Sequence, residues 1–203
     1  MRDKLYYVHD PMCSWCWGYR PTWLRLQERL PESIAVVYLV GGLAHDSDLP
    51  MTDEMQSGLT HVWHRIHNEL GAEFNFDFWT KNQPRRSTYP ACRSVLAAEK
   101  INNKGLEMIE AIQLAYYTRA MNPSDISVLI QLAEEIGLDP HRFSDLMKQK
   151  SFEQEFKEEL RFAHQLPIAG FPSLVLETGG RYIPIKLDYK DEQISLADIM
   201  SHL

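Results

Sequence analysis

The stretch HDPMCSWCWGYRP, residues 9–21, follows an apolar run and places two cysteines three positions apart. Cys13 and Cys16 are a redox pair, half of a metal site, or two small core residues. Pro11 disfavours the α conformation at Asp10, so it separates a strand from the helix that we expect to begin near Cys13. The choice between the three interpretations depends on the fold around this stretch.

Two predicted strands flank this helix. Residues 5–9 (LYYVH) and residues 34–40 (IAVVYLV) have strand composition, and the second is so uniformly apolar that we expect both of its faces to be covered. The helix between them directs Trp23, Leu26 and Leu30 toward the sheet. The order strand, helix, strand predicts a βαβ unit with a parallel pair of strands.

The next part of the chain, residues 52–165, has the pattern of helices throughout. Apolar residues recur at helical spacing in two runs, which are Met55, Leu59, Val62, Trp63, Ile66 and Leu70, and Leu106, Ile109, Ile112, Tyr116 and Ala120. Further helices are expected to begin at Asn122-Pro123, at Asp139-Pro140 and at Ser151, which has capping-box spacing with Gln154.

Strand character returns near the carboxyl end. SLVLE (173–177) and RYIPI (181–185) are joined through two glycines, as in a hairpin, and Pro184 suits an edge strand. Ser195 and Asp198 are candidate caps of a last helix. The predicted order of elements is therefore βαβ, then a helical block, then ββα.

This order requires the first and last segments to meet in one sheet. It predicts an α/β thioredoxin fold, βαβ...ββα, with a large all-helical insertion. Residues 1–51 and 166–203 form the thioredoxin-like domain, and residues 52–165 form the helical insertion domain. A CxxC directly after the first strand of a βαβ pattern is the redox signature of that fold.

Composition excludes several classes of function. The chain has 203 residues and a formal net charge of −7, which argues against binding to the nucleic-acid backbone. No stretch has the length and apolarity of a membrane span, and the first residues lack the apolar core of a secretory signal, so we expect a cytoplasmic location. Three cysteines are too few for a disulfide scaffold, and they suit a reducing compartment.

The cysteine spacing suits redox chemistry. Unpaired N–H groups at a helix start favour an anion, so Cys13 is the expected nucleophilic thiolate. Cys16, about one turn further, is placed to attack the mixed disulfide that Cys13 forms. A zinc site needs two more ligands, and the sequence has no second CxxC or Cys-His cluster at usual spacing, so no metal is expected. Inert core cysteines are the third alternative.

The motif Cys13-Ser14-Trp15-Cys16-Trp17-Gly18, together with Gly170-Phe171-Pro172 before a strand, resembles the DsbA family of thioredoxin-fold proteins. The opening H-D-P-x-C-x-W-C-W-G, residues 9–18, is similar to the cytoplasmic protein-disulfide isomerase branch of that family. The resemblance implies dithiol-disulfide exchange on protein, peptide or small-thiol substrates. It also implies that Pro172 is cis and faces the CxxC.

Several other residues have candidate roles. Trp15 is expected to be partly exposed and to offer an apolar platform to a substrate, and Phe171 to pair with an extended substrate segment. Arg85, Arg86 and Ser87 lie ahead of the predicted helix of Cys92 and are candidates for holding an anion such as a glutathione carboxylate. Glutathione is thus a possible co-substrate, and no bound cofactor is expected.

The remaining thiol and the histidines have structural interpretations. Cys92 shares a helical face with apolar residues and is expected in the core. His61, His64 and His67 fall on the side of their helix away from the apolar stripe, which predicts a solvated face. His9 is expected to be structural, at the end of the first strand.

Two other functions stay open. The first is a glutathione-dependent transferase or isomerase of the kappa-class or hydroxychromene-carboxylate isomerase type, which shares the implied fold but does not need a resolving thiol such as Cys16. The second is a redox-sensitive binding protein in which the CxxC acts as a switch.

Overall fold

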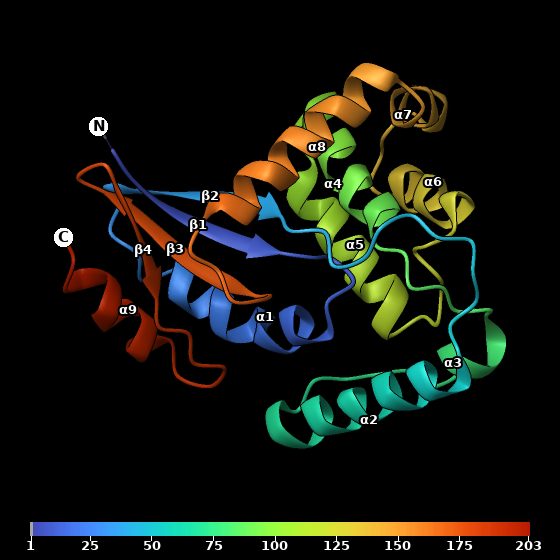
Figure 1. Ribbon diagram of the computed structural model, residues 1–203, viewed down its shortest axis with the longest axis horizontal. Coiled ribbons are helices and arrows are strands. Elements are labelled where there is room, and N and C mark those ends of the chain that lie inside the picture. The colour runs from blue at the N-terminus through green and yellow to red at the C-terminus, as the bar shows by residue number, and fades with distance from the viewer. Residues whose placement is uncertain (1) are drawn as a thin grey trace.

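A computed structural model describes residues 2–203 (Figure 1). Four strands form one sheet in the order β2-β1-β3-β4. Their bounds are β1 Asp3–His9, β2 Ile34–Val40, β3 Ser173–Thr178 and β4 Arg181–Ile185. The first two strands are parallel, while β3 is antiparallel to both β1 and β4.

The helices in this range fall into two groups. Two belong to the part of the chain around the sheet, α1 Ser14–Gln27 and α9 Glu192–Met200. The others lie between β2 and β3: α2 Asp53–Leu70, α3 Phe78–Lys81, α4 Tyr89–Asn102, α5 Gly105–Tyr117, α6 Ile126–Glu135, α7 Pro140–Met147 and α8 Lys150–Gln165. The α/β fold with a βαβ and a ββα segment is as the sequence predicts, and the assignment of domain boundaries stays a prediction.

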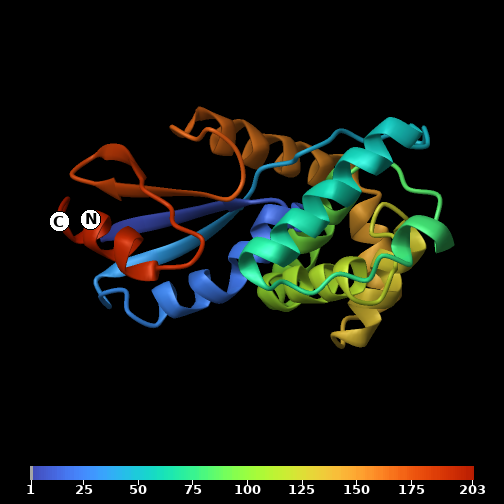
Figure 2. The same ribbon diagram turned by 90° about the horizontal axis from the view of Figure 1, so that it is seen from below.

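Helices cover both faces of the sheet (Figure 2). Alternation along β1 explains this, because successive side chains of a strand point to opposite faces. Leu5 and Tyr7 pack in one cluster with Trp23 of α1 and Ile199 of α9. The neighbouring residues of β1 pack on the other face, against the end of α8.

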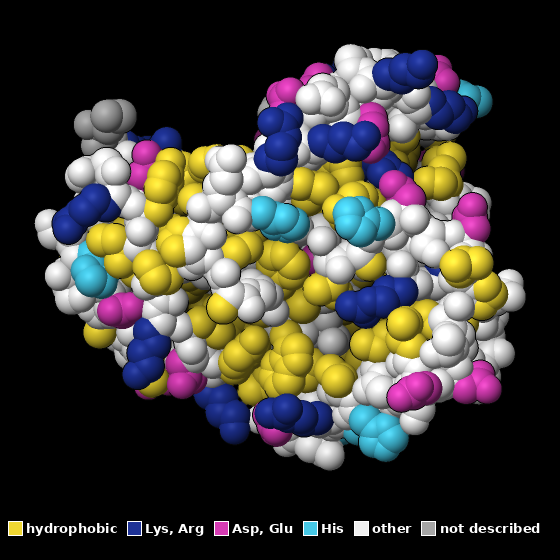
Figure 3. Space-filling model, viewed as in Figure 1, with side chains coloured by type: hydrophobic (Ala, Val, Ile, Leu, Met, Phe, Trp, Pro, Cys, Tyr) yellow, Lys and Arg dark blue, Asp and Glu magenta, His cyan; other side chains and the backbone are white. Residues whose placement is uncertain are grey.

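The helical block has its own aromatic core, built around Trp63, Phe78 and Phe143. Met12 and Val40 belong to this same core, although they lie at the ends of the sheet segments β1 and β2. The loops after β1 and β2 are therefore anchored between the sheet and the helical block. Apolar side chains gather in that middle region of the face seen in Figure 3. Among the helices of residues 2–203, none is long and apolar enough for a membrane span.

Three predicted helix starts are wrong. The helix expected from Asn122-Pro123 begins at Ile126, because the chain first turns there with Asp125 N–H bonded to the Asn122 carbonyl. Ser151 caps nothing, since α8 begins one residue earlier and Gln149 is its N-cap. Asp191 caps α9 by accepting from Gln193 N–H.

Other expectations about packing are partly corrected. Ser195 lies inside α9 and donates to the Lys186 carbonyl, which tethers the helix to the preceding loop. Leu106, predicted on an apolar face, is 52% exposed, and Ala120 lies beyond the end of α5 with a positive φ of 53°. The middle of β2 is only partly buried, because β2 is an edge strand. Pro184 does lie on an edge strand, β4.

Candidate active site

A tight turn connects β1 to the cysteine motif. The Asp10 carboxylate accepts a hydrogen bond of 2.8 Å from Met12 N–H, and the Asp10 carbonyl accepts one of 3.0 Å from Cys13 N–H. Asp side chains favour such turns because they bond the backbone two residues on. As a result Cys13 is the N-cap of α1, with extended backbone, and Cys16 lies in its first turn.

The second carboxylate oxygen of Asp10 joins distant segments to this turn. It accepts from Leu43 N–H at 2.6 Å, from the Thr88 hydroxyl at 2.6 Å and from the Cys92 thiol at 3.5 Å. Asp10 is fully buried, and burial raises its pKa, while these hydrogen bonds act in the opposite direction. One local feature of the sequence points to this role, an Asp-Pro pair before the CxxC.

The two cysteines differ in environment. Cys13 is 6% exposed, and its Sγ lies 3.5 Å from the carbonyl oxygen of Phe171. Cys16 is completely buried. Burial raises the pKa of Cys16 well above the ordinary value, and the nearby Cys13 thiol raises it further. Both are free thiols. Cys16 is thus held protonated directly behind Cys13.

The segment before β3 forms the opposite wall of the site. The peptide bond between Phe171 and Pro172 is cis, Pro172 is buried, and Phe171 is partly exposed. Gly41 allows the Phe171 ring to approach, because a Cβ on Gly41 would lie only 2.0 Å from a ring carbon. The fold therefore brings Cys13 next to Phe171, although the two residues are 158 positions apart in the sequence.

A cleft of about 240 Å³ opens beside Cys13. Side chains from the sheet segments and from the helical block line it: Met12, Cys13, Ser14, Trp15, Leu43, Met51, Leu59, Val62, Trp63, Arg85, Arg86, Thr88, Tyr116 and Phe171. Most are apolar, and the two arginines supply the only formal positive charge in this lining. Such a cleft suits an apolar or peptide-like group with a negative end.

Trp15 is partly exposed at this cleft, as predicted. The Arg65 guanidinium lies 5.1 Å from the centre of its ring, and Tyr189 meets the ring edge-on. Of the two arginines, Arg85 is paired with Asp125 at 2.6 Å. Arg86 is exposed and has no ion pair among residues 2–203, so it is the arginine free to meet an anion.

Other sequence candidates lie elsewhere. Cys92 is buried in the helical core as expected, with its thiol on Asp10. His61, His64 and His67 are exposed on α2, as predicted. His9 is completely buried, and within the described part of the chain neither ring nitrogen has a hydrogen-bond partner, which sequence reasoning did not foresee.

Sheet, cysteine motif and cis-proline together define a thioredoxin-fold protein of the DsbA-like type. The family model described as Thioredoxin matches residues 6–179, so the chain belongs to the thioredoxin family. The sequence-based resemblance to DsbA-like proteins is confirmed at the level of family and fold.

Three similar solved structures add detail to the comparison. A candidate protein disulfide isomerase from Nitrosomonas europaea is 28% identical, with a TM-score of 0.84 over 100% of this chain and 97% of that one. The cytosolic disulfide reductase DsbM from Pseudomonas aeruginosa is 26% identical, with a TM-score of 0.74 over 90% of this chain and 89% of that one. DsbM has also been solved with GSH, and that structure shares the fold at 24% identity, with a TM-score of 0.75 over 98% of this chain and 100% of that one.

Curated relatives include a different kind of protein. The ClpXP adapter protein SpxH of Halalkalibacterium halodurans is 22% identical over 85% of this chain, and SpxH of Bacillus subtilis is 22% identical over 84%. The chain spans 58% and 57% of the length of these two relatives. The two solved structures of 26% and 28% identity are named as disulfide enzymes, whereas these relatives are named as adapters.

Proposed function

We propose that this protein catalyses thiol-disulfide exchange through Cys13 and Cys16. The observation that carries the proposal is the asymmetric cysteine pair. Cys13 caps α1 at the rim of an open cleft, and Cys16 is buried behind it with a raised pKa. A pair of this kind provides an attacking thiol and a resolving thiol with separate tasks.

The proposed reaction has two displacements. The Cys13 thiolate attacks one sulfur of a substrate disulfide, which forms a mixed disulfide and releases the other substrate sulfur as a thiolate. Cys16 then loses its proton and attacks the Cys13 sulfur, which closes the Cys13-Cys16 disulfide and releases the second substrate thiol. The substrate disulfide is reduced by two electrons, and the protein dithiol is oxidised by two.

We assign the cleft residues to substrate binding on geometric grounds. Trp15 offers an apolar surface, and the backbone of Phe171 lies where an extended peptide could pair with it before Pro172. Arg86 is placed to meet the carboxylate of a small thiol. Glutathione is the proposed electron donor that restores the dithiol, and the GSH complex of DsbM supports this choice. The name of the same neighbour, a cytosolic reductase, supports a cytoplasmic location.

A trapping experiment tests the division of roles. Cys16→Ser should accumulate a mixed disulfide on Cys13 after exposure to oxidised glutathione, because no resolving thiol remains. Cys13→Ser should accumulate little, because Cys16 is buried. Cys92→Ser is the matched control, since Cys92 is as deeply buried as Cys16 and lies outside the cleft. Mass spectrometry gives the adduct mass, and equal trapping by the two motif variants would contradict the assignment.

A second candidate function is a redox-sensitive adapter, which the SpxH relatives favour. An adapter needs the thiol pair only as a switch, so exchange with small disulfides would be slow in all variants. Turnover of a dithiol-coupled disulfide substrate by the wild-type protein separates the two functions. Cys16 counts against the glutathione-dependent transferase, because that chemistry has no use for a buried resolving thiol.

A further inference from the structure

A second cavity, about 540 Å³ in volume, opens where β2 meets α4, α5 and α8. It shares no lining residue with the cleft at Cys13. Its volume falls in the range of about 300–1,000 Å³ that is usual for small-molecule sites, and such sites often lie where separate parts of a protein meet. The proposed exchange reaction makes no use of it.

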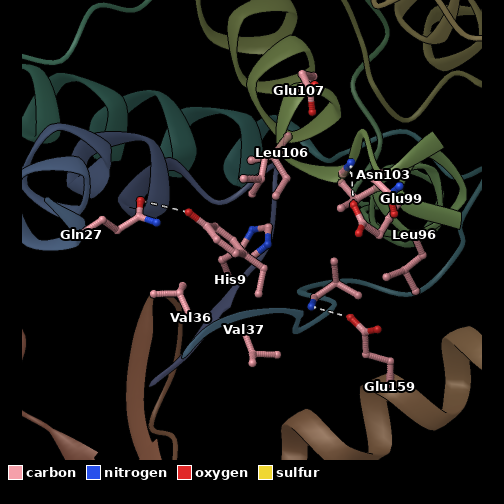
Figure 4. A pocket seen from close by; sticks show the side chains of 15 residues that line it. His9, Gln27, Val36, Val37, Leu96, Glu99, Asn103, Leu106, Glu107 and Glu159 are labelled. Atoms are coloured by element: carbon pink, nitrogen blue, oxygen red, sulfur yellow. Dashed lines mark hydrogen bonds between the residues drawn. The ribbon is translucent and has the colours of Figure 1, made fainter. Parts of the chain in front are cut away.

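His9 contributes a buried polar group to this cavity. Its side chain is completely buried, yet neither Nδ1 nor Nε2 has a hydrogen-bond partner among residues 2–203. Aromatic rings hold it in place: Tyr7 stacks on it at 5.3 Å and Tyr38 meets it edge-on at 5.9 Å. Figure 4 shows the imidazole among the cavity side chains, between Gln27 and Asn103.

The unpartnered imidazole points to a ligand. Burial lowers the pKa of His9 to about 3, so the ring is neutral and offers one N–H donor and one bare nitrogen. An unsatisfied buried polar group costs about 1–3 kcal/mol. A bound molecule with an N–H group aimed at the bare nitrogen would remove part of that cost.

The charged residues that line the cavity indicate the sign of the ligand's charge. Its ionisable lining residues besides His9 and Tyr38 are three glutamates, and neither lysine nor arginine is among the lining residues. Glu99 accepts from Gly105 N–H at 3.0 Å. Glu159 accepts from Val40 N–H through Oε1, and its Oε2 has no partner among the described residues. Three acidic groups without a basic one favour a cation.

Apart from the amides of Gln27 and Asn103, the rest of the wall is largely apolar and suits a hydrocarbon chain. Val36, Val37 and Leu96 line the cavity, with Leu106 above them in Figure 4. We propose that this cavity binds an aliphatic diamine, with one ammonium group on Glu159, the other on the acidic wall near His9, and the methylene chain against the valine and leucine side chains.

Calorimetry with 1,6-diaminohexane at pH 8 tests the proposal, because burial raises the pKa of Glu159 to about 7 and its carboxyl is mostly ionised at pH 8. Binding should be at least threefold tighter than that of hexylamine, which has one ammonium group, and neither 1,6-hexanediol nor hexanoate should bind detectably. Glu159→Gln keeps an acceptor for Val40 N–H but loses the charge, and it should weaken diamine binding at least tenfold. His9→Phe keeps the stacked ring but removes both nitrogens, and it should weaken binding at least threefold.

Glu158→Gln is the matched control, because Glu158 is an exposed neighbour on the same helix and lies outside the cavity. Its diamine affinity should equal that of the wild type. Equal losses in the two glutamate variants, equal binding of hexanoate, or no binding of the diamine would each overturn the proposal.

Methyl NMR of the wild-type protein locates the site without any substitution. The diamine should shift the methyl signals of Val36, Leu96 and Leu106 and leave those of Leu59 and Val62, which line the cleft at Cys13, unchanged. Shifts confined to Leu59 and Val62 would place the ligand in the wrong cavity and overturn the proposal.

Discussion

Replacing Glu159 by glutamine should remove a pH dependence from the stability of the protein. Glu159 is a partly buried residue of α8, and Val40 N–H donates to its carboxyl group at 3.0 Å. Burial raises its pKa from 4.5 to about 7, while the hydrogen bond from Val40 acts in the opposite direction. Glutamine keeps the shape and the acceptor but cannot ionise.

The sign and size follow from proton linkage. With its pKa raised on folding, the Glu159 carboxyl holds its proton more tightly in the folded than in the unfolded protein. Its contribution to stability is therefore fully present below pH 4.5 and is lost as the pH rises to about 7. A shift of about 2.5 pH units corresponds to about 3 kcal/mol at 1.36 kcal/mol per unit. This value is an upper bound, because part of the side chain still contacts water.

Denaturant unfolding of the wild type and Glu159→Gln at pH 5 and pH 8 measures the effect. Other titrating groups are the same in both proteins, so they cancel in the difference. The stability of the wild type relative to the variant should fall by roughly 2–3 kcal/mol between the two pH values. Glu158→Gln, at an exposed position on the same helix, should show no such change. A wild-type-minus-Glu159→Gln difference that is equal at both pH values would refute the reasoning.

Three further substitutions test the site. Gly41→Ala would push the ring of Phe171 away, because the new Cβ overlaps it, and turnover should fall about tenfold in a coupled disulfide-reduction assay while the fold is retained by circular dichroism. Asp10→Asn leaves one acceptor oxygen for donors such as Leu43 N–H, so urea unfolding should show a loss of at least about 2 kcal/mol. Arg86→Gln should raise the KM for glutathione roughly two- to fivefold, as expected for an exposed ion pair, and an unchanged KM would contradict its assignment to the anion.

The sequence predicts the sheet well because its strands carry local signals. Residues 34–40 are continuously apolar and form β2 with the same bounds. The hairpin of β3 and β4 follows from two glycines between two short apolar runs, and both glycines have positive φ. These signals need no knowledge of the distant chain.

Helix starts were harder to predict because tertiary contacts decide them. Ser195 has the chemistry of a cap, but its hydroxyl is used by the Lys186 carbonyl. Ser151 has capping-box spacing, but the helix starts one residue earlier. A side chain that can cap a helix can also bond elsewhere, and the sequence alone does not show which partner is nearer.

Long-range contacts within the site also could not be predicted from local sequence patterns. The sequence marks Cys13, Cys16 and the proline segment, yet it contains nothing that pairs Asp10 with Thr88 or leaves the nitrogens of His9 unpartnered. Both depend on how the helical block packs against the ends of β1 and β2. Residue type limits what such groups can do, but packing decides which partners they find.

Strand direction explains why the two halves of the site meet. Because β3 is antiparallel to β1, the start of β3 lies beside the end of β1, and Val8 is directly opposite Ser173. The residues just outside this pair, 9–13 on one side and 171–172 on the other, must therefore be neighbours. A one-residue slip in this register would move Leu174 and Leu176 to the face of the sheet where Val175 now packs, and Val175 to the other face. The different packing on the two faces of β3 thus favours one register, and that register holds the Phe171 carbonyl at Cys13.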